Sequence, residues 1–144
     1  MSKKDAFDLK DFLPYLLNQA AEVTSREFQT YYRRRYGMLR TEWRVVFHLG
    51  RYGDMTATEI CDRSMTHKTK VSRAVKALEK KRFIKRTVVE ADKRNETLSL
   101  TPSGRAAFRD LFSAARTYNE TVARQFSAED NAVLRACLAK IAGT

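Results

Sequence analysis

The most informative stretch of the chain reads Val71-Ser72-Arg73-Ala74-Val75-Lys76-Ala77-Leu78, and it lies at the centre of a strongly basic segment. Its apolar residues recur at helical spacing on one face, whereas Arg73 and Lys76 fall on the opposite face. Between Ser64 and Val88 the sequence holds nine lysines and arginines and one acid, Glu79. A solvated helix usually mixes both signs of charge, so a face of nearly one sign predicts a polyanionic partner. Nucleic acid is the first candidate.

The residues before this basic helix predict a helix-turn-helix arrangement. Thr56 has the side chain of an N-cap, and it precedes a short helix over residues 57–63. A tight turn then leads into the basic helix, which we expect over residues 67–81. Two short helices that end in a one-sided cationic face are typical of this motif.

After the basic helix, the hydrophobic period changes from 3.6 residues to two. Residues 83–89 are rich in β-branched and aromatic side chains, and residues 97–100 alternate polar with apolar. The charged residues 90–96 between them suit a hairpin tip. The sequence therefore predicts a small β-wing next to the helix-turn-helix.

Longer helices are predicted on both sides of this region. Residues 11–35 carry an apolar stripe, and a second helix begins with Thr41 as N-cap and ends at Gly53. Beyond the strands, Thr101 and Ser127 cap two further helices with apolar stripes of their own. The fold class is thus mainly α with a small β-wing.

The composition is that of a folded, single-domain protein. The chain has 144 residues, 43% of them hydrophobic, and a formal net charge of +11 at pH 7. No apolar run approaches the roughly 18 residues that span a bilayer, and no signal peptide is evident, so we expect the protein in the cytoplasm. The two cysteines, Cys61 and Cys137, form no disulfide framework.

Motifs for catalysis or metal binding are not found. The histidines and cysteines fall on separate predicted elements, so no metal-ligand spacing occurs. Glycine-rich phosphate loops and recognisable nucleophile contexts are also missing. We therefore expect no metal, no cofactor and no enzymatic activity.

Several short motifs follow one another in a specific order and spacing. They are Trp43-Arg44-Val45, Thr58-Glu59-Ile60, Lys68-Thr69-Lys70-Val71-Ser72-Arg73-Ala74-Val75, Leu78-Glu79, Asp92-Lys93-Arg94 and Leu98-Ser99-Leu100-Thr101-Pro102-Ser103-Gly104. In this order they resemble the MarR family of winged-helix transcriptional regulators, and the resemblance covers nearly the whole chain.

The resemblance implies a triangular homodimer. Residues 1–36 and 102–144 would form the helical dimerisation region, and residues 37–101 the winged helix-turn-helix that binds DNA. Two positions depart from the usual family pattern: Arg82 stands where glycine is usual after the recognition helix, and His67 where an acidic residue is common.

A recognition helix enters the major groove with its N-terminal part, so Lys68, Thr69, Ser72 and Arg73 would meet base edges and nearby phosphates. Arg94 at the wing tip resembles the minor-groove arginine of the family, and Asp92 would orient its guanidinium. The full set of expected DNA-binding residues is Thr56, Lys68, Thr69, Lys70, Ser72, Arg73, Lys76, Lys80, Asp92 and Arg94.

Members of the family often bind small aromatic acids or phenolic compounds between the dimerisation helices and the DNA-binding lobe. Tyr15, Asn18, Trp43 and His48 are our candidates for lining such an effector cleft. Aromatic residues at helical spacing also suit an ordinary core.

The favoured function is a dimeric repressor that leaves a pseudo-palindromic operator when a small effector binds. One alternative is an architectural DNA-binding dimer without an effector, which would bind all sequences equally. Another is a thiol-based redox regulator acting through Cys61, although this residue also suits a small buried hydrophobe. A third is a winged-helix protein whose partner is another protein.

Overall fold

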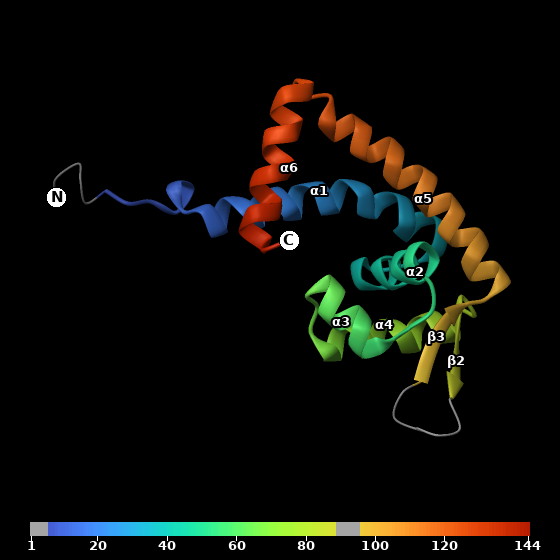
Figure 1. Cartoon of the computed structure of the whole chain (residues 1–144). Coiled ribbons are helices and arrows are strands. Elements are labelled where there is room, and N and C mark those ends of the chain that lie inside the picture. The colour runs from blue at the N-terminus through green and yellow to red at the C-terminus, as the bar shows by residue number, and fades with distance from the viewer. Residues whose placement is uncertain (1–5, 89–95) are drawn as a thin grey trace.

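The computed structural model describes residues 6–88 and 96–144. In these residues the elements are a 3₁₀ turn, η2, at Leu9–Asp11, followed by α1 (Leu13–Tyr36), α2 (Arg40–Tyr52), β1 (Met55–Thr56), α3 (Ala57–Ser64), α4 (Lys68–Lys80), β2 (Ile84–Val88), β3 (Glu96–Leu100), α5 (Pro102–Ala123) and α6 (Ala128–Ala142). Figure 1 shows α1, α5 and α6 at one end of the molecule and α3, α4 and the strands at the other, with α2 between them.

The strands form an antiparallel sheet in the order β1-β3-β2. Ile84 pairs with Leu100 at one end of the β2–β3 ladder and Val88 with Glu96 at the other. The two-residue strand β1, which the sequence did not predict, pairs with β3 beside Leu98. This pairing attaches the start of α3 to the wing.

Side-chain caps begin three of the helices as expected. The hydroxyl of Thr56 accepts a hydrogen bond from the amide of Glu59 at 3.2 Å, and Thr101 and Ser127 accept at 3.0 Å from the amides three residues on. These bonds satisfy amides that the first turn leaves without a helical partner.

The predicted start of α2 is wrong. Thr41 lies inside the helix, and Leu39 precedes its first residue. The amide of Leu39 donates to Glu42 Oε2 at 3.1 Å, so a carboxylate three residues on satisfies this end of the helix and no capping hydroxyl is needed.

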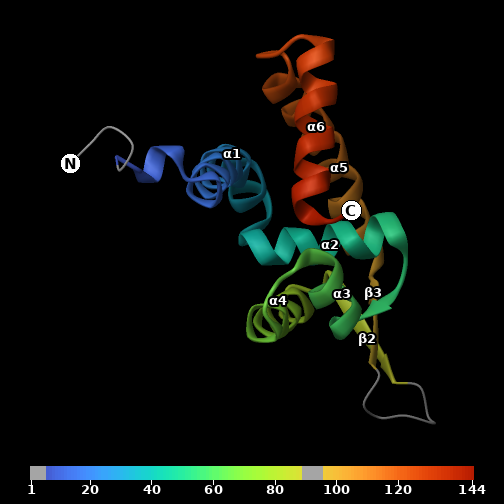
Figure 2. The ribbon, with the colours of Figure 1, turned by 60° about the vertical axis from the view of Figure 1, so that its left-hand side comes forward.

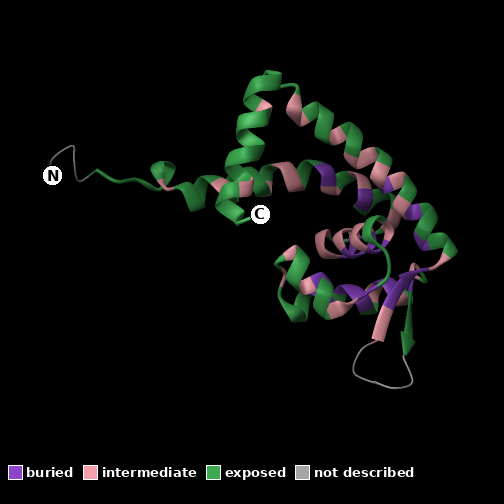
Figure 3. Ribbon diagram, viewed as in Figure 1, coloured by how far each residue is buried: buried purple, intermediate pink, exposed green. Residues whose placement is uncertain are grey.

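One hydrophobic core lies between α2, α4 and the sheet. The apolar face of α4 is buried, as its spacing predicts, with Val71 at 1% and Leu78 at 0% exposure. Val45 and Val46 of α2 and Leu98 of β3 belong to the same buried cluster. Figure 3 shows the buried residues gathered in this part of the molecule. The core therefore fixes the orientation of α4.

The outer helices are much less buried. No residue of α6 is buried against the described part of the chain, and Val133 and Ile141 are 57% and 58% exposed. Leu13 and Val23 of α1 are also exposed. Figure 1 shows α6 diverging from α5 after the turn that joins them, and Figure 2 shows α6 well apart from α1, which it crosses only in projection in Figure 1. None of the described helices is long and apolar enough to cross a membrane.

Candidate nucleic-acid interface

The outward side of α4 is a nearly continuous cationic and polar surface. Val71, Ala74, Val75 and Leu78 turn inward and are buried. The α4 cationic face consists of the exposed residues Lys68, Thr69, Lys70, Ser72, Arg73, Lys76 and Lys80. All the DNA-binding residues predicted on this helix therefore share one accessible surface.

The start of α4 is capped by a histidine. The Nδ1 atom of His67 accepts a hydrogen bond from the amide of Thr69 at 3.1 Å. An imidazole nitrogen can accept only when it carries no proton, so this bond needs the neutral ring with its proton on Nε2. Met65, in the preceding turn, has a left-handed backbone with φ of 51° and is 87% exposed.

The single acid of the basic stretch is neutralised. Glu79 Oε1 accepts from Nε of Arg86 at 2.6 Å, and the same guanidinium donates to Glu96 Oε2 at 2.8 Å. Arg86 thereby ties the end of α4 to both strands of the wing. The α4 cationic face keeps its positive charge because Glu79 is already paired.

Two sets of contacts hold the C-terminal end of α4. Lys81 Nζ donates to the carbonyl of Gly37 at 2.7 Å and to Glu42 Oε1 at 2.6 Å. Arg82 has a left-handed backbone with φ of 63°, and its carbonyl accepts from the hydroxyls of Thr101 at 2.6 Å and Ser103 at 3.1 Å. The end of α4 is thus fixed to the α1–α2 turn and to the start of α5.

Two predicted contacts, Asp92 and Arg94, lie outside the described residues. Thr56 serves mainly as the cap of α3. It also lines a groove between α3, α4 and β3 together with Lys68 and Cys61, which is half-buried.

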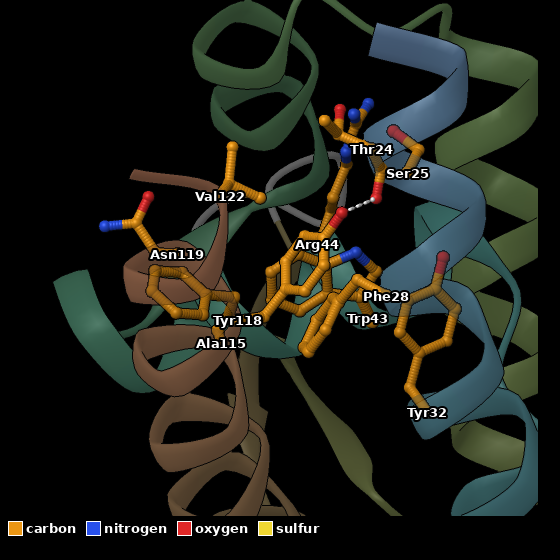
Figure 4. A pocket seen from close by; sticks show the side chains of 11 residues that line it. Thr24, Ser25, Phe28, Tyr32, Trp43, Arg44, Ala115, Tyr118, Asn119 and Val122 are labelled. Carbon is orange, nitrogen blue, oxygen red and sulfur yellow. Dashed lines mark hydrogen bonds between the residues drawn. The ribbon is translucent and has the colours of Figure 1, made fainter. Parts of the chain in front are cut away.

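A cavity of about 430 Å³ lies between α1, α2 and α5. Figure 4 shows its walls, which are mainly aromatic. The rings of Phe28 and Trp43 meet edge to face at 5.1 Å between centroids, and Tyr32 stacks on Trp43 at 5.8 Å. Phe47 and Tyr118 complete the aromatic lining.

Two polar groups of this cavity have no partner among the described residues. The hydroxyl of Tyr32 forms no hydrogen bond although the residue is only 1% exposed. Burial raises the pKa of Tyr32, so the hydroxyl stays protonated and can donate. The half-buried Arg44 makes no ion pair in the described chain, and burial lowers the pKa of its guanidinium. A buried phenol and an unpaired cation together suit an anionic ligand.

The structure separates the four predicted effector residues. Trp43 lines the cavity, whereas Tyr15 and Asn18 lie on another pocket along α1. His48 is held by its own helix, since its Nδ1 lies 2.6 Å from the carbonyl of Arg44. Tyr32 and Arg44 were missed, because periodicity places Tyr32 in a core stripe and Arg44 is one of many arginines.

The chain matches the model of the MarR family over residues 36–95. No curated protein sequence matches it. Among solved structures it is similar to a MarR/EmrR family transcriptional regulator from Acinetobacter sp. ADP1, at 25% identity and a TM-score of 0.86, covering 95% of this chain and 96% of that one.

Two further structures are similar over almost their full length. One is a MarR family transcriptional regulator from Silicibacter pomeroyi DSS-3, at 25% identity and a TM-score of 0.78, covering 94% of this chain and 98% of that one. The other is the S. aureus MepR–DNA complex, at 22% identity and a TM-score of 0.80, covering 90% and 96%, a likeness of fold alone. The comparisons therefore agree: residues 36–95 match the MarR family, and almost the whole chain is similar to solved structures of MarR family transcriptional regulators.

Proposed function

We propose that the protein is a homodimeric repressor that binds a pseudo-palindromic DNA operator and releases it when a small aromatic anion occupies the α1–α2–α5 cavity. The observation that carries the DNA-binding part is the α4 cationic face, which is exposed and faces away from the core. A surface of one charge sign on a helix-turn-helix is the electrostatic footprint of a nucleic-acid partner.

The role of each residue of this face would depend on its position along α4, with base contacts near the start of the helix and phosphate contacts farther along. Arg73 lies in the first half of the helix, where a bidentate guanidinium can read guanine in the major groove. Lys76 and Lys80 lie farther along and would contact phosphates, which adds affinity without specificity. Asp92 and Arg94 keep the role proposed from the family resemblance, at the minor groove.

A homodimer would cover the apolar residues that α1 and α6 leave exposed, such as Val23 and Ile141. We assign residues 1–36 and 102–144 to this dimerisation region and residues 37–101 to DNA binding. Two recognition helices about one turn of DNA apart, roughly 34–36 Å, require half-sites centred about 10–10.5 bp apart or a multiple of that. We expect such a protein to act in the cytoplasm, where it meets operator DNA.

The effector part of the proposal is supported by the unpaired groups of the cavity. Arg44 would bind a carboxylate, the hydroxyl of Tyr32 would donate to the same ligand, and Trp43 would stack on its ring. A small aromatic carboxylate satisfies all three interactions, and Arg44 thus supplies the charge that the predicted effector residues lacked.

Selection from a library of randomised duplexes tests the DNA-binding function. We expect enrichment of inverted repeats and an affinity that falls steeply with salt. Equal affinity for all duplexes would favour the architectural alternative. Failure to bind any duplex at low salt would overturn the proposal and favour a protein partner.

Benzoate, a simple aromatic carboxylate, tests the effector site on the selected duplex. It should weaken binding by the native protein but not by Arg44→Met. Arg40→Met is the matched control, because Arg40 pairs with Glu22 and does not line the cavity. Equal release of the native protein and Arg44→Met would show that the cavity is not the effector site.

A further inference from the structure

The end of the recognition helix is attached to the wall of the cavity by one ammonium group. Lys81, directly after α4, is fixed to that helix because its amide donates to the carbonyl of Ala77 at 3.0 Å. Its Nζ atom reaches the carbonyl of Gly37, which follows α1, and the carboxylate of Glu42 in α2. The ammonium therefore bridges two helices that form the cavity.

The carboxylate in this bridge is buried and fully used. Glu42 is only 3% exposed, and its Oε1 and Oε2 atoms accept from Lys81 and from the amide of Leu39. A buried carboxylate that loses its cation is left with a large desolvation cost, so the three groups tend to move together. The Lys81–Glu42 pair is consequently a strut between α4 and the α1–α2 turn.

Two walls of the cavity lie on either side of this turn. Tyr32 is in the last turns of α1, and Trp43 follows Glu42 directly in the first turn of α2. Their rings stack on one another at 5.8 Å. A shift of α1 relative to α2 would change the separation of these rings, and the two acceptors of Lys81 lie at the end of α1 and in α2.

We infer that the Lys81–Glu42 strut couples the cavity to the recognition helix, with Lys81 as a positioning residue that itself contacts neither ligand. The inference rests on the proposed function, because it needs DNA on α4. Coupling between two sites is reciprocal, so DNA on α4 must also alter the cavity. The strut joins α4 to the ends of two helices that form the cavity. Contiguous hydrogen-bond and ion-pair contacts of this kind can transmit a helix shift from one site to the other.

The chain carries its own reporter of the cavity. Trp43 is the only tryptophan in the sequence. Its emission, excited at a wavelength that DNA does not absorb, therefore reports the cavity wall alone. Anisotropy of a labelled duplex from the selection described above reports DNA binding independently.

The test compares the native protein with the double variant Lys81→Met/Glu42→Gln. The double variant leaves no unpaired buried charge, and the glutamine can still accept from the amide of Leu39, so the fold is retained. In the native protein we expect Trp43 emission to change with the same midpoint as the anisotropy. In the double variant the duplex should still bind at higher protein concentration, with most of the Trp43 change lost.

Lys85→Met is the matched control, since it removes one exposed charge from β2 without touching the strut. It should keep the full Trp43 change at saturating DNA. An undiminished change in the double variant, or no change in the native protein while it binds the duplex, would overturn the coupling. Absence of DNA binding in the anisotropy would instead overturn the proposed function, and the coupling with it.

Discussion

At the scale of single residues, the backbone of Arg82 stores strain. Its φ of 63° lies in the left-handed region, which costs a residue with a Cβ atom on the order of 1 kcal/mol relative to glycine. We expect Arg82→Gly to raise the free energy of unfolding by about 1 kcal/mol and Tm by a few degrees, as measured by thermal denaturation. The hydroxyls of Thr101 and Ser103 bind only its carbonyl, which glycine retains.

Arg82→Ala separates strain from any contact of the side chain with phosphate. Alanine keeps the Cβ atom, so the Arg82→Ala variant should not be more stable than the native protein. Like the glycine variant, it lacks the guanidinium. A phosphate contact would weaken DNA binding and flatten its salt dependence in both variants. Equal melting temperatures for both variants would show that the left-handed conformation is not the source of strain.

Asp110 predicts a dependence of stability on pH. Its Oδ1 and Oδ2 atoms accept from the hydroxyls of Tyr31 at 2.7 Å and Tyr36 at 2.6 Å, and this joins α1 to α5. Burial raises the pKa of Asp110, but the hydrogen bonds of Tyr36 and Tyr31, with the charge of Arg35, outweigh it, so its pKa is lowered from 3.8. The stabilisation is therefore present above pH 3.8 and lost as the pH falls through the lower, folded-state pKa.

We accordingly expect Asp110→Asn to unfold at lower urea than the native protein at neutral pH, with the difference shrinking in acid below the normal carboxyl range. The exposed Asp62→Asn should stay close to the native protein throughout. A difference for Asp110→Asn that stays constant with pH would mean that the carboxylate charge is not what stabilises the α1–α5 contact.

Among the elements, α4 should contain residues of two kinds: those that recognise the DNA sequence and those that add affinity for any duplex. Arg73→Ala should weaken the selected duplex by about 1–3 kcal/mol and relax preference at one position per half-site, with little effect on a shuffled duplex. Lys76→Ala should weaken both duplexes alike and lower the salt slope by about 1. Anisotropy titrations of both duplexes at several salt concentrations measure this. Equal losses on the two duplexes for Arg73→Ala would remove its base-reading role.

The elements differ in how far sequence predicts them. Residues 71–78 were predicted because their period and charge are local, and the structure buries the expected face. Strand β1 was not predicted, because two residues are too few to show a hydrophobic period. Its Met55 pairs with Leu98, which lies far along the chain. The start of α2 was mispredicted because the Glu42 side chain accepts a hydrogen bond from the amide of Leu39. A search for a capping hydroxyl does not find this interaction. The cavity could not be predicted from the sequence, because the absence of a hydrogen-bond partner for the Tyr32 hydroxyl depends on the folded surroundings of that residue.

At the scale of the whole molecule, the exposed apolar stripe of α6 predicts an obligate dimer. The native protein should sediment as a dimer at micromolar concentration. Leu134→Glu places a charge within this stripe and should shift the protein to monomer with reduced helix content by circular dichroism. Ala136→Glu adds the same charge on the opposite side of the helix and should remain dimeric. A stable, fully helical native monomer would contradict this assembly.

The lack of buried residues in α6 has a consequence for gene dosage. A helix of 15 residues with little support from its own chain is only marginally stable in water, so a newly made chain completes its fold when it meets a second one. Pairing scales with the square of chain concentration when chains are scarce. Halving the number of chains in a cell should then lower the amount of dimer to about a quarter, and a gene that the dimer regulates should respond at a threshold of expression.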